Sequence, residues 1–162
     1  MKKFTLEIKW AVIFTVSSII WVAFEKTLGF HNEDIEKQML FGYLFAIPAI
    51  LIYALALSEK KRTYFFGKMN WMQGVVSGVF MSLFISILSP LAHYISYEIV
   101  SPDFFKNAID YATQSKVMSA TVAADYFNLK SYIIQGALGG ISSGVVTSAI
   151  VAYFLQSKSE KK

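Results

Sequence analysis

The segment MNWMQGVVSGVFMSLFISILSPLAHYISY, Met69–Tyr97, runs for 29 residues without a formally charged side chain. A helix of roughly 20 apolar residues crosses a bilayer, because each residue adds about 1.5 Å and the hydrocarbon core is about 30 Å thick. This segment is long enough to span a membrane with residues to spare. It therefore predicts a membrane protein rather than a soluble one.

Three further segments complete the predicted set of spans. Gln38–Ser58 and Ser131–Ser157 are uncharged over 21 and 27 residues, whereas Trp10–Phe24 is uncharged over only 15. The shortest segment becomes long enough if it starts near Leu6 and Lys9 extends its ammonium group toward the lipid headgroups. No small-x-small cleavage site follows it, so a cleaved signal peptide is the less favoured alternative. We predict a single membrane domain over 1–162, with spans at approximately 6–25, 38–58, 70–97 and 131–156 and an external loop at 98–130.

The composition agrees with these spans and excludes several kinds of chemistry. Hydrophobic residues make up 55% of the chain and charged residues 16%, with a mean hydropathy of +0.48. The chain has no cysteine, which excludes disulfides, thiolate nucleophiles and cysteine-ligated metal clusters. Basic residues outnumber acidic ones by 15 to 11, but they lie between apolar runs rather than in one patch. Nucleic acid is therefore not an expected partner.

The distribution of lysine and arginine predicts the orientation of the spans. Ten of these residues lie at the N-terminus, in the second loop and in the tail, and five lie in the other two loops. Basic residues accumulate on the cytoplasmic side of membrane proteins. We therefore predict a multi-pass protein of the bacterial inner (cytoplasmic) membrane, with both the N- and C-termini in the cytoplasm.

The long loop at 98–130 carries a further helical pattern. Its apolar residues recur at helical spacing: Phe105, Ala108, Ile109 and Ala112. Ser101 is the expected N-cap of this helix, and Pro102 suits its first position. The predicted fold class is therefore all-α, a polytopic four-transmembrane-helix bundle with an external amphipathic helix between the third and fourth spans.

Small residues recur every four positions in two consecutive spans. The strip in the third span is Gly74, Gly78, Ser82 and Ser86, and the strip in the fourth is Gly136, Gly140, Gly144 and Ser148. Membrane helices associate through close backbone approach, which small side chains allow. We predict that these strips are helix-packing surfaces. They either face each other within one chain or form a seam between two copies.

Few residues in the predicted spans offer chemistry. His93 is the only ionisable side chain within the uncharged runs; it follows Pro90 and precedes Glu98. A titratable group in a kinked helix suits an ion pathway, whereas a structural hydrogen bond to nearby backbone is the interpretation we favour. His93 and Glu98 are the candidate polar site. Glu25 is expected to be a solvated carboxylate at the membrane interface.

No enzymatic or metal site is predicted. His31 lies near Glu33, Asp34 and Glu36, but their loose spacing in a flexible loop is weak support for a metal site. Nothing in the spans suggests a paired-carboxylate or Ser–His arrangement. We therefore predict no catalytic residue, no cofactor and no metal.

Two stretches carry a family resemblance. They are KKRTYFFGKMNWMQGVVSG, Lys60–Gly78, and IVSPDFFKNAIDYA, Ile99–Ala112, and a Gly-rich last span with a lysine tail follows them. This order of features resembles an uncharacterised family of small four-span integral membrane proteins found chiefly in Bacteroidetes, a domain of unknown function. The resemblance covers essentially the whole chain. It implies the same architecture and supplies no activity.

The functional expectation is a non-enzymatic interaction or assembly module. Its partners would be the lipid bilayer and either a copy of itself or another membrane protein. The alternative is a small oligomeric transporter or channel with His93 near the pathway. Transport requires polar groups that face a cavity deep in the membrane. The transporter hypothesis therefore requires a polar cavity between the spans, whereas the assembly hypothesis does not.

Overall fold

The computed structural model describes residues 4–157, and over that range the chain forms helices and no strands. The elements are α1 Thr5–Thr27, η1 Ile35–Lys37, α2 Gln38–Tyr43, α3 Ala46–Thr63, α4 Trp71–Tyr94, η2 Ile95–Val100, α5 Phe104–Gln114, α6 Ala120–Tyr126 and α7 Leu129–Leu155. Four segments are long and apolar enough to cross a membrane: Thr5–Thr27, Ile35–Thr63, Trp71–Val100 and Leu129–Leu155. The prediction of four such helices in an all-α chain is confirmed.

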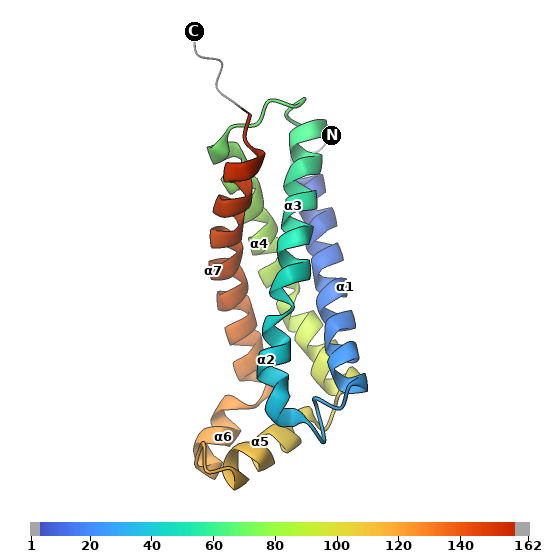
Figure 1. The fold of residues 1–162 in the computed structure, drawn as a ribbon, viewed down its shortest axis with the longest axis vertical. Helices are drawn as coiled ribbons and strands as arrows, with labels where there is room; N and C mark the ends of the chain where they lie inside the picture. Colours follow the sequence, from blue (N-terminus) through green and yellow to red (C-terminus); the bar gives the residue numbers. More distant parts are fainter. Residues whose placement is uncertain (1–3, 158–162) are drawn as a thin grey trace.

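The long helices lie side by side as an elongated bundle (Figure 1). Helix α4 contacts α1, α3 and α7, and its contact with α7 is the most extensive between any two elements of residues 4–157. The start of α1 and the end of α7 lie at one end of the bundle, and α5 and α6 lie at the other (Figure 1). We call the end with α5 and α6 the capped end.

The second span consists of two helices rather than one. Helix α2 ends at Tyr43, and α3 begins at Ala46 with Pro48 in its first turn. Proline has no backbone N–H and therefore fits the start of a helix better than its interior. The last turn of α3 is basic and includes Lys60, which the sequence had placed in a loop.

The third span begins with a capping box and ends in a π-helical turn. The side chain of Asn70 accepts the Gln73 N–H at 2.9 Å, and the Gln73 side chain accepts the Asn70 N–H at 2.9 Å. Helix α4 contains Pro90 and continues into the π-helical η2. Such turns are rare and often occur at functional sites. This one brings Ser101 back over the end of α1.

Helix α5 begins later than predicted, and Ser101 does not cap it. Asp103 occupies the N-cap position and makes no side-chain capping bond, while the Ser101 hydroxyl contacts His31 instead. The buried face of α5 consists of Phe104, Ala108 and Ala112. The capping prediction was wrong because a neighbouring loop competes for the same hydroxyl.

The core lies where α1, α3, α4 and α7 meet. Its buried members are Ala11, Ile52, Tyr53, Ala56, Leu57, Met69, Met81, Ile85, Val151 and Ala152. Large apolar side chains are also exposed on the outside of the bundle, among them Ile20 at 63%, Ile87 at 71% and Phe154 at 78%. Extensive exposed apolar surface is typical of a protein that contacts lipid.

Candidate functional site

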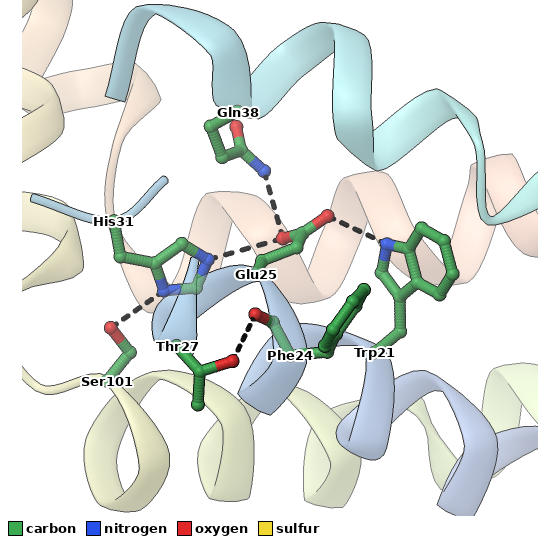
Figure 2. A network of polar contacts seen from close by, with 7 residues as sticks. All are labelled: Trp21, Phe24, Glu25, Thr27, His31, Gln38 and Ser101. Atoms are coloured by element: carbon green, nitrogen blue, oxygen red, sulfur yellow. Dashed lines mark hydrogen bonds and ion pairs between the residues drawn. The ribbon is translucent and has the colours of Figure 1, made fainter. Parts of the chain in front are cut away.

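A buried polar network lies at the capped end, around Glu25 and His31 (Figure 2). Glu25 is 2% exposed and His31 is fully buried. The Glu25 carboxylate accepts a hydrogen bond from the indole N–H of Trp21 at 2.8 Å, and its other oxygen lies 3.2 Å from His31 Nε2. The Gln38 amide donates to that second oxygen at 3.5 Å. His31 Nδ1 lies 2.8 Å from the Ser101 hydroxyl.

This network joins segments that are far apart in the sequence. The Lys26 ammonium donates to the Val100 carbonyl at 2.6 Å, and the Asn107 side chain donates to the His31 carbonyl at 2.9 Å. The His31 ring also packs against Phe104, with 4.7 Å between ring centroids. The network therefore attaches the start of α5 to the end of α1.

The expectation of a solvated carboxylate at Glu25 was wrong, and the burial of His31 was not predicted. The loop after α1 folds back over the helix end, and Gly29 makes this turn with a φ of +82°, which favours glycine. The folded-back loop buries the side chains of Glu25 and His31. The spacing of Trp21 and Glu25, one helical turn apart, was the one signal in the sequence; the other partners come from tertiary structure. No group of three or more His, Asp or Glu side chains within residues 4–157 could hold a metal ion.

A cavity of about 580 Å³ lies beside the network, between η1, α2, α4, η2, α5, α6 and α7. We call it the tyrosine cavity. Seven aromatic side chains line it: Tyr43, Tyr97, Phe104, Tyr111, Tyr126, Phe127 and Tyr132. Its polar lining consists of Glu36, Gln38, His93 and Gln135. Sequence reasoning missed this cavity, because its lining comes from five separate segments.

His93 contributes one free acceptor to the cavity. Its Nδ1 lies 2.8 Å from the backbone carbonyl of Ser89, which can only accept, so Nδ1 carries the proton of the neutral ring. Nε2 is then an acceptor. A Cβ added at Gly136 would lie 2.7 Å from Nε2, so the ring is seated directly against α7. Glu98 is exposed on η2 and does not line the cavity, so the structure does not join it to His93 there.

The predicted small-residue strips meet different neighbours. A Cβ at Gly74 would lie 2.7 Å from the Ala152 Cβ, and one at Gly78 would overlap Ser148. A Cβ at Gly144 would overlap Ser82, whose hydroxyl lies 2.8 Å from the Tyr53 hydroxyl. These residues thus lie at the contact of α4 with α7.

The two remaining strip positions, Gly140 and Ser86, are less closely packed than the others. No heavy atom lies within 4 Å of a Cβ placed on Gly140, apart from its own helix backbone and chain neighbours. Ser86 is half-buried. The strip in the fourth span is therefore only partly covered within one chain.

Another face of α7 is uncovered. Gly139, Ser142 and Ser143 are all exposed, and we call them the open face of α7. Gln135, one turn before Gly139, is also exposed and lines the rim of the tyrosine cavity. Both serine hydroxyls donate to carbonyls of the preceding turn, and the Gln135 amide donates to the Ser131 hydroxyl at 3.0 Å. The open face is thus small and polar, although its helix is long and apolar enough to cross a membrane.

Ion pairs join α1 to α3 at the opposite end of the bundle. The Lys60 ammonium lies 2.8 Å from the Glu7 carboxylate, and both side chains are buried. The Ser77 hydroxyl donates to the same Glu7 oxygen at 2.6 Å. Lys9, which is expected to extend toward the headgroups, pairs with Glu59 at 2.6 Å. The buried pair of Lys60 and Glu7 was not predicted, because its two residues come from different helices, α3 and α1.

Comparison with known proteins gives one family match. The model of a family described as "Protein of unknown function (DUF4199)" matches residues 9–157. Searches of curated proteins and of solved structures return no match. The matched range includes most of the described chain, and its description carries no activity.

Proposed function

We propose that this chain, which belongs to the family of unknown function DUF4199, is a non-enzymatic assembly module of a bacterial inner membrane. It spans the membrane four times with both termini in the cytoplasm, and its α5 and α6 lie outside. The distribution of basic residues, ten against five, supports this orientation. Its function would be to associate with copies of itself.

The open face of α7 is the observation that carries this proposal. Lipid offers no hydrogen-bond partners, so two outward-facing serines are better placed against another protein. Gly139 and Ser143 are one turn apart, and small side chains at this spacing let two backbones approach closely. A second copy of α7 presents the same face and therefore complements it by symmetry.

Assembly is a better explanation than transport through the chain itself. A pathway would have to pass the middle of the bundle. There Gly78 packs against Ser148, and Gly144 packs against Ser82 and Tyr53. These close contacts leave no room between α4 and α7. The tyrosine cavity lies between these close contacts and the capped end of the bundle.

Single cysteines test the proposal directly, because the chain has none of its own. We expect Gly139→Cys and Ser143→Cys to form disulfide-linked dimers when native membranes are oxidised, since a disulfide requires Cα atoms within about 7 Å. Leu138→Cys is the matched control. Leu138 is 63% exposed on the same helix, outside the open face.

The readout is the dimer band on a non-reducing gel. Absence of dimers at both Gly139→Cys and Ser143→Cys would contradict the proposal. Equal cross-linking at Leu138→Cys would contradict it as well, because that result would reflect random collision in the membrane.

A further inference from the structure

We infer that the tyrosine cavity binds a lipophilic monocation, that is, a compound with one positive charge on an apolar body. This binding site goes beyond the proposed assembly function and does not depend on it. The inference rests on the charge, the ring faces, the free hydrogen-bond acceptors and the size of the cavity. The charge disfavours anions, and the other three features favour a cation with an apolar body.

The charge of the lining excludes an anion. Glu36 is among the lining residues, and neither a lysine nor an arginine is. The two loops that meet at the capped end, 25–37 and 98–130, contain eight acidic and five basic residues. Their field therefore raises the local concentration of cations and disfavours phosphates and carboxylates.

The aromatic lining suits a cation that has lost its water. A positive charge is attracted to the face of an aromatic ring, and the attraction is strongest where water is excluded. The rings of Tyr97 and Tyr132 stand nearly perpendicular to each other, at 86°, with centroids 5.2 Å apart. Tyr97 is 8% exposed, so its ring is held in a largely dry environment.

The polar side chains of the lining offer hydrogen-bond acceptors to a ligand. The Nε2 of the neutral His93 ring accepts, because Nδ1 carries the proton that bonds to Ser89. Within residues 4–157, no hydrogen bond engages the hydroxyls of Tyr97 and Tyr132. These groups can receive the N–H donors of an ammonium-type ligand, or a C–H edge next to a quaternary centre.

The size and place of the cavity select an apolar body. A volume of about 580 Å³ lies within the usual range for small-molecule pockets. Gly136 lies seven residues into α7, which places the floor of the cavity about 10 Å below the start of that helix. The apolar body would lie at this depth, while the charge stays near Glu36 and the tyrosine rings.

The test uses tetraphenylphosphonium as the cation and tetraphenylborate as an anion of the same shape. Binding to the purified full chain in a neutral detergent is measured by equilibrium dialysis. We expect saturable binding of the cation with one site per chain. We expect the anion to bind at least tenfold more weakly.

Paired variants assign the site. Glu36→Gln should weaken cation binding about threefold, whereas Glu33→Gln, which removes an equal charge from the same loop but not from the lining, should change it little. Tyr132→Leu and Tyr126→Leu should weaken it by about tenfold and about threefold, because each removes a ring face. Tyr153→Leu is their control, since Tyr153 is 63% exposed and lies at the other end of α7.

Several results would overturn the inference. They are no saturable cation binding, equal binding of the borate, or unchanged binding in both tyrosine variants. If Tyr132→Leu does not fold, Tyr126→Leu decides the question, because Tyr126 is 42% exposed and its loss leaves the core intact. The cross-linking of α7 is read out separately, so either proposal can fail alone.

Discussion

Glu25 shows how much one residue can differ from its expected role. A carboxylate next to a lysine at the end of a span should be solvated, yet it lies 2% exposed with three side chains directed toward it. Burying a charge costs free energy unless its hydrogen bonds and counter-charges are supplied locally. Trp21, His31 and Gln38 supply these contacts. These contacts hold α1, the loop after it and α2 together at the capped end.

Removal of the carboxylate should therefore destabilise the protein. We expect Glu25→Leu to lower the free energy of unfolding by about 3 kcal/mol, because it leaves the buried donors of Trp21 and His31 without their acceptor. Glu25→Gln keeps one acceptor oxygen and should cost less. The thermal midpoint in detergent measures both effects. The exposed Glu33→Leu serves as control, and a loss at Glu33 as large as at Glu25 would refute the explanation.

At the scale of elements, the contact between α4 and α7 holds the bundle together. Both strips repeat every four residues, but a helix repeats every 3.6, so each step of four turns by about 40°. A strip of four positions therefore winds around its helix and cannot face one neighbour throughout. Gly144 meets Ser82, Gly136 meets His93, and no atom from another part of the bundle lies within 4 Å of a Cβ at Gly140.

The strip glycines should therefore differ in their tolerance of a larger side chain. Gly78→Leu places its side chain into Ser148 and should lower the free energy of unfolding by about 2–3 kcal/mol. Gly140→Leu should leave the fold intact, because no neighbouring element lies where its Cβ would be. The sequence alone had placed both glycines in helix-packing strips, which would make both positions intolerant of leucine.

Val76→Leu is the control, because Val76 is 45% exposed on α4. Thermal unfolding in detergent together with size-exclusion chromatography distinguishes the three variants. If Gly78→Leu were as stable as Val76→Leu, the α4–α7 contact could not be as close as described.

At the scale of the whole molecule, the two ends of the bundle differ in construction. One end carries the start of α1 and the end of α7, and there α1 and α3 are joined by buried and partly buried ion pairs. The other end carries α5 and α6, the Glu25 network and the tyrosine cavity. The two ends of the bundle are therefore chemically distinct.

The proposed orientation can be measured with single cysteines. Phe66 and Val117 are 86% and 67% exposed and lie in loops at opposite ends of the bundle. We expect a membrane-impermeant maleimide to label Val117→Cys on intact cells. Phe66→Cys should be labelled only after the cells are permeabilised, because the last turn of α3 and the loop after it carry four basic residues and should face the cytoplasm. The opposite labelling pattern would reverse every inside and outside assignment.

The sequence by itself determined the four helices that can cross a membrane. Spanning depends on length and hydropathy, which are local properties that add along the chain. Met69–Tyr97 therefore predicts its helix without knowledge of any neighbour. The capping box at Asn70 and the break before Pro48 are likewise decided within a few residues.

Only the tertiary structure decided which side chains meet. The burial of Glu25 and His31 depends on a loop that turns back at Gly29 and on a hydroxyl that lies 70 residues away at Ser101. The tyrosine cavity depends on how α2, α5, α6 and α7 are arranged around the end of α4. Rotation of a helix about its own axis changes its neighbours without changing its hydropathy. For that reason the spans could be predicted from the residues alone, whereas the candidate site could not.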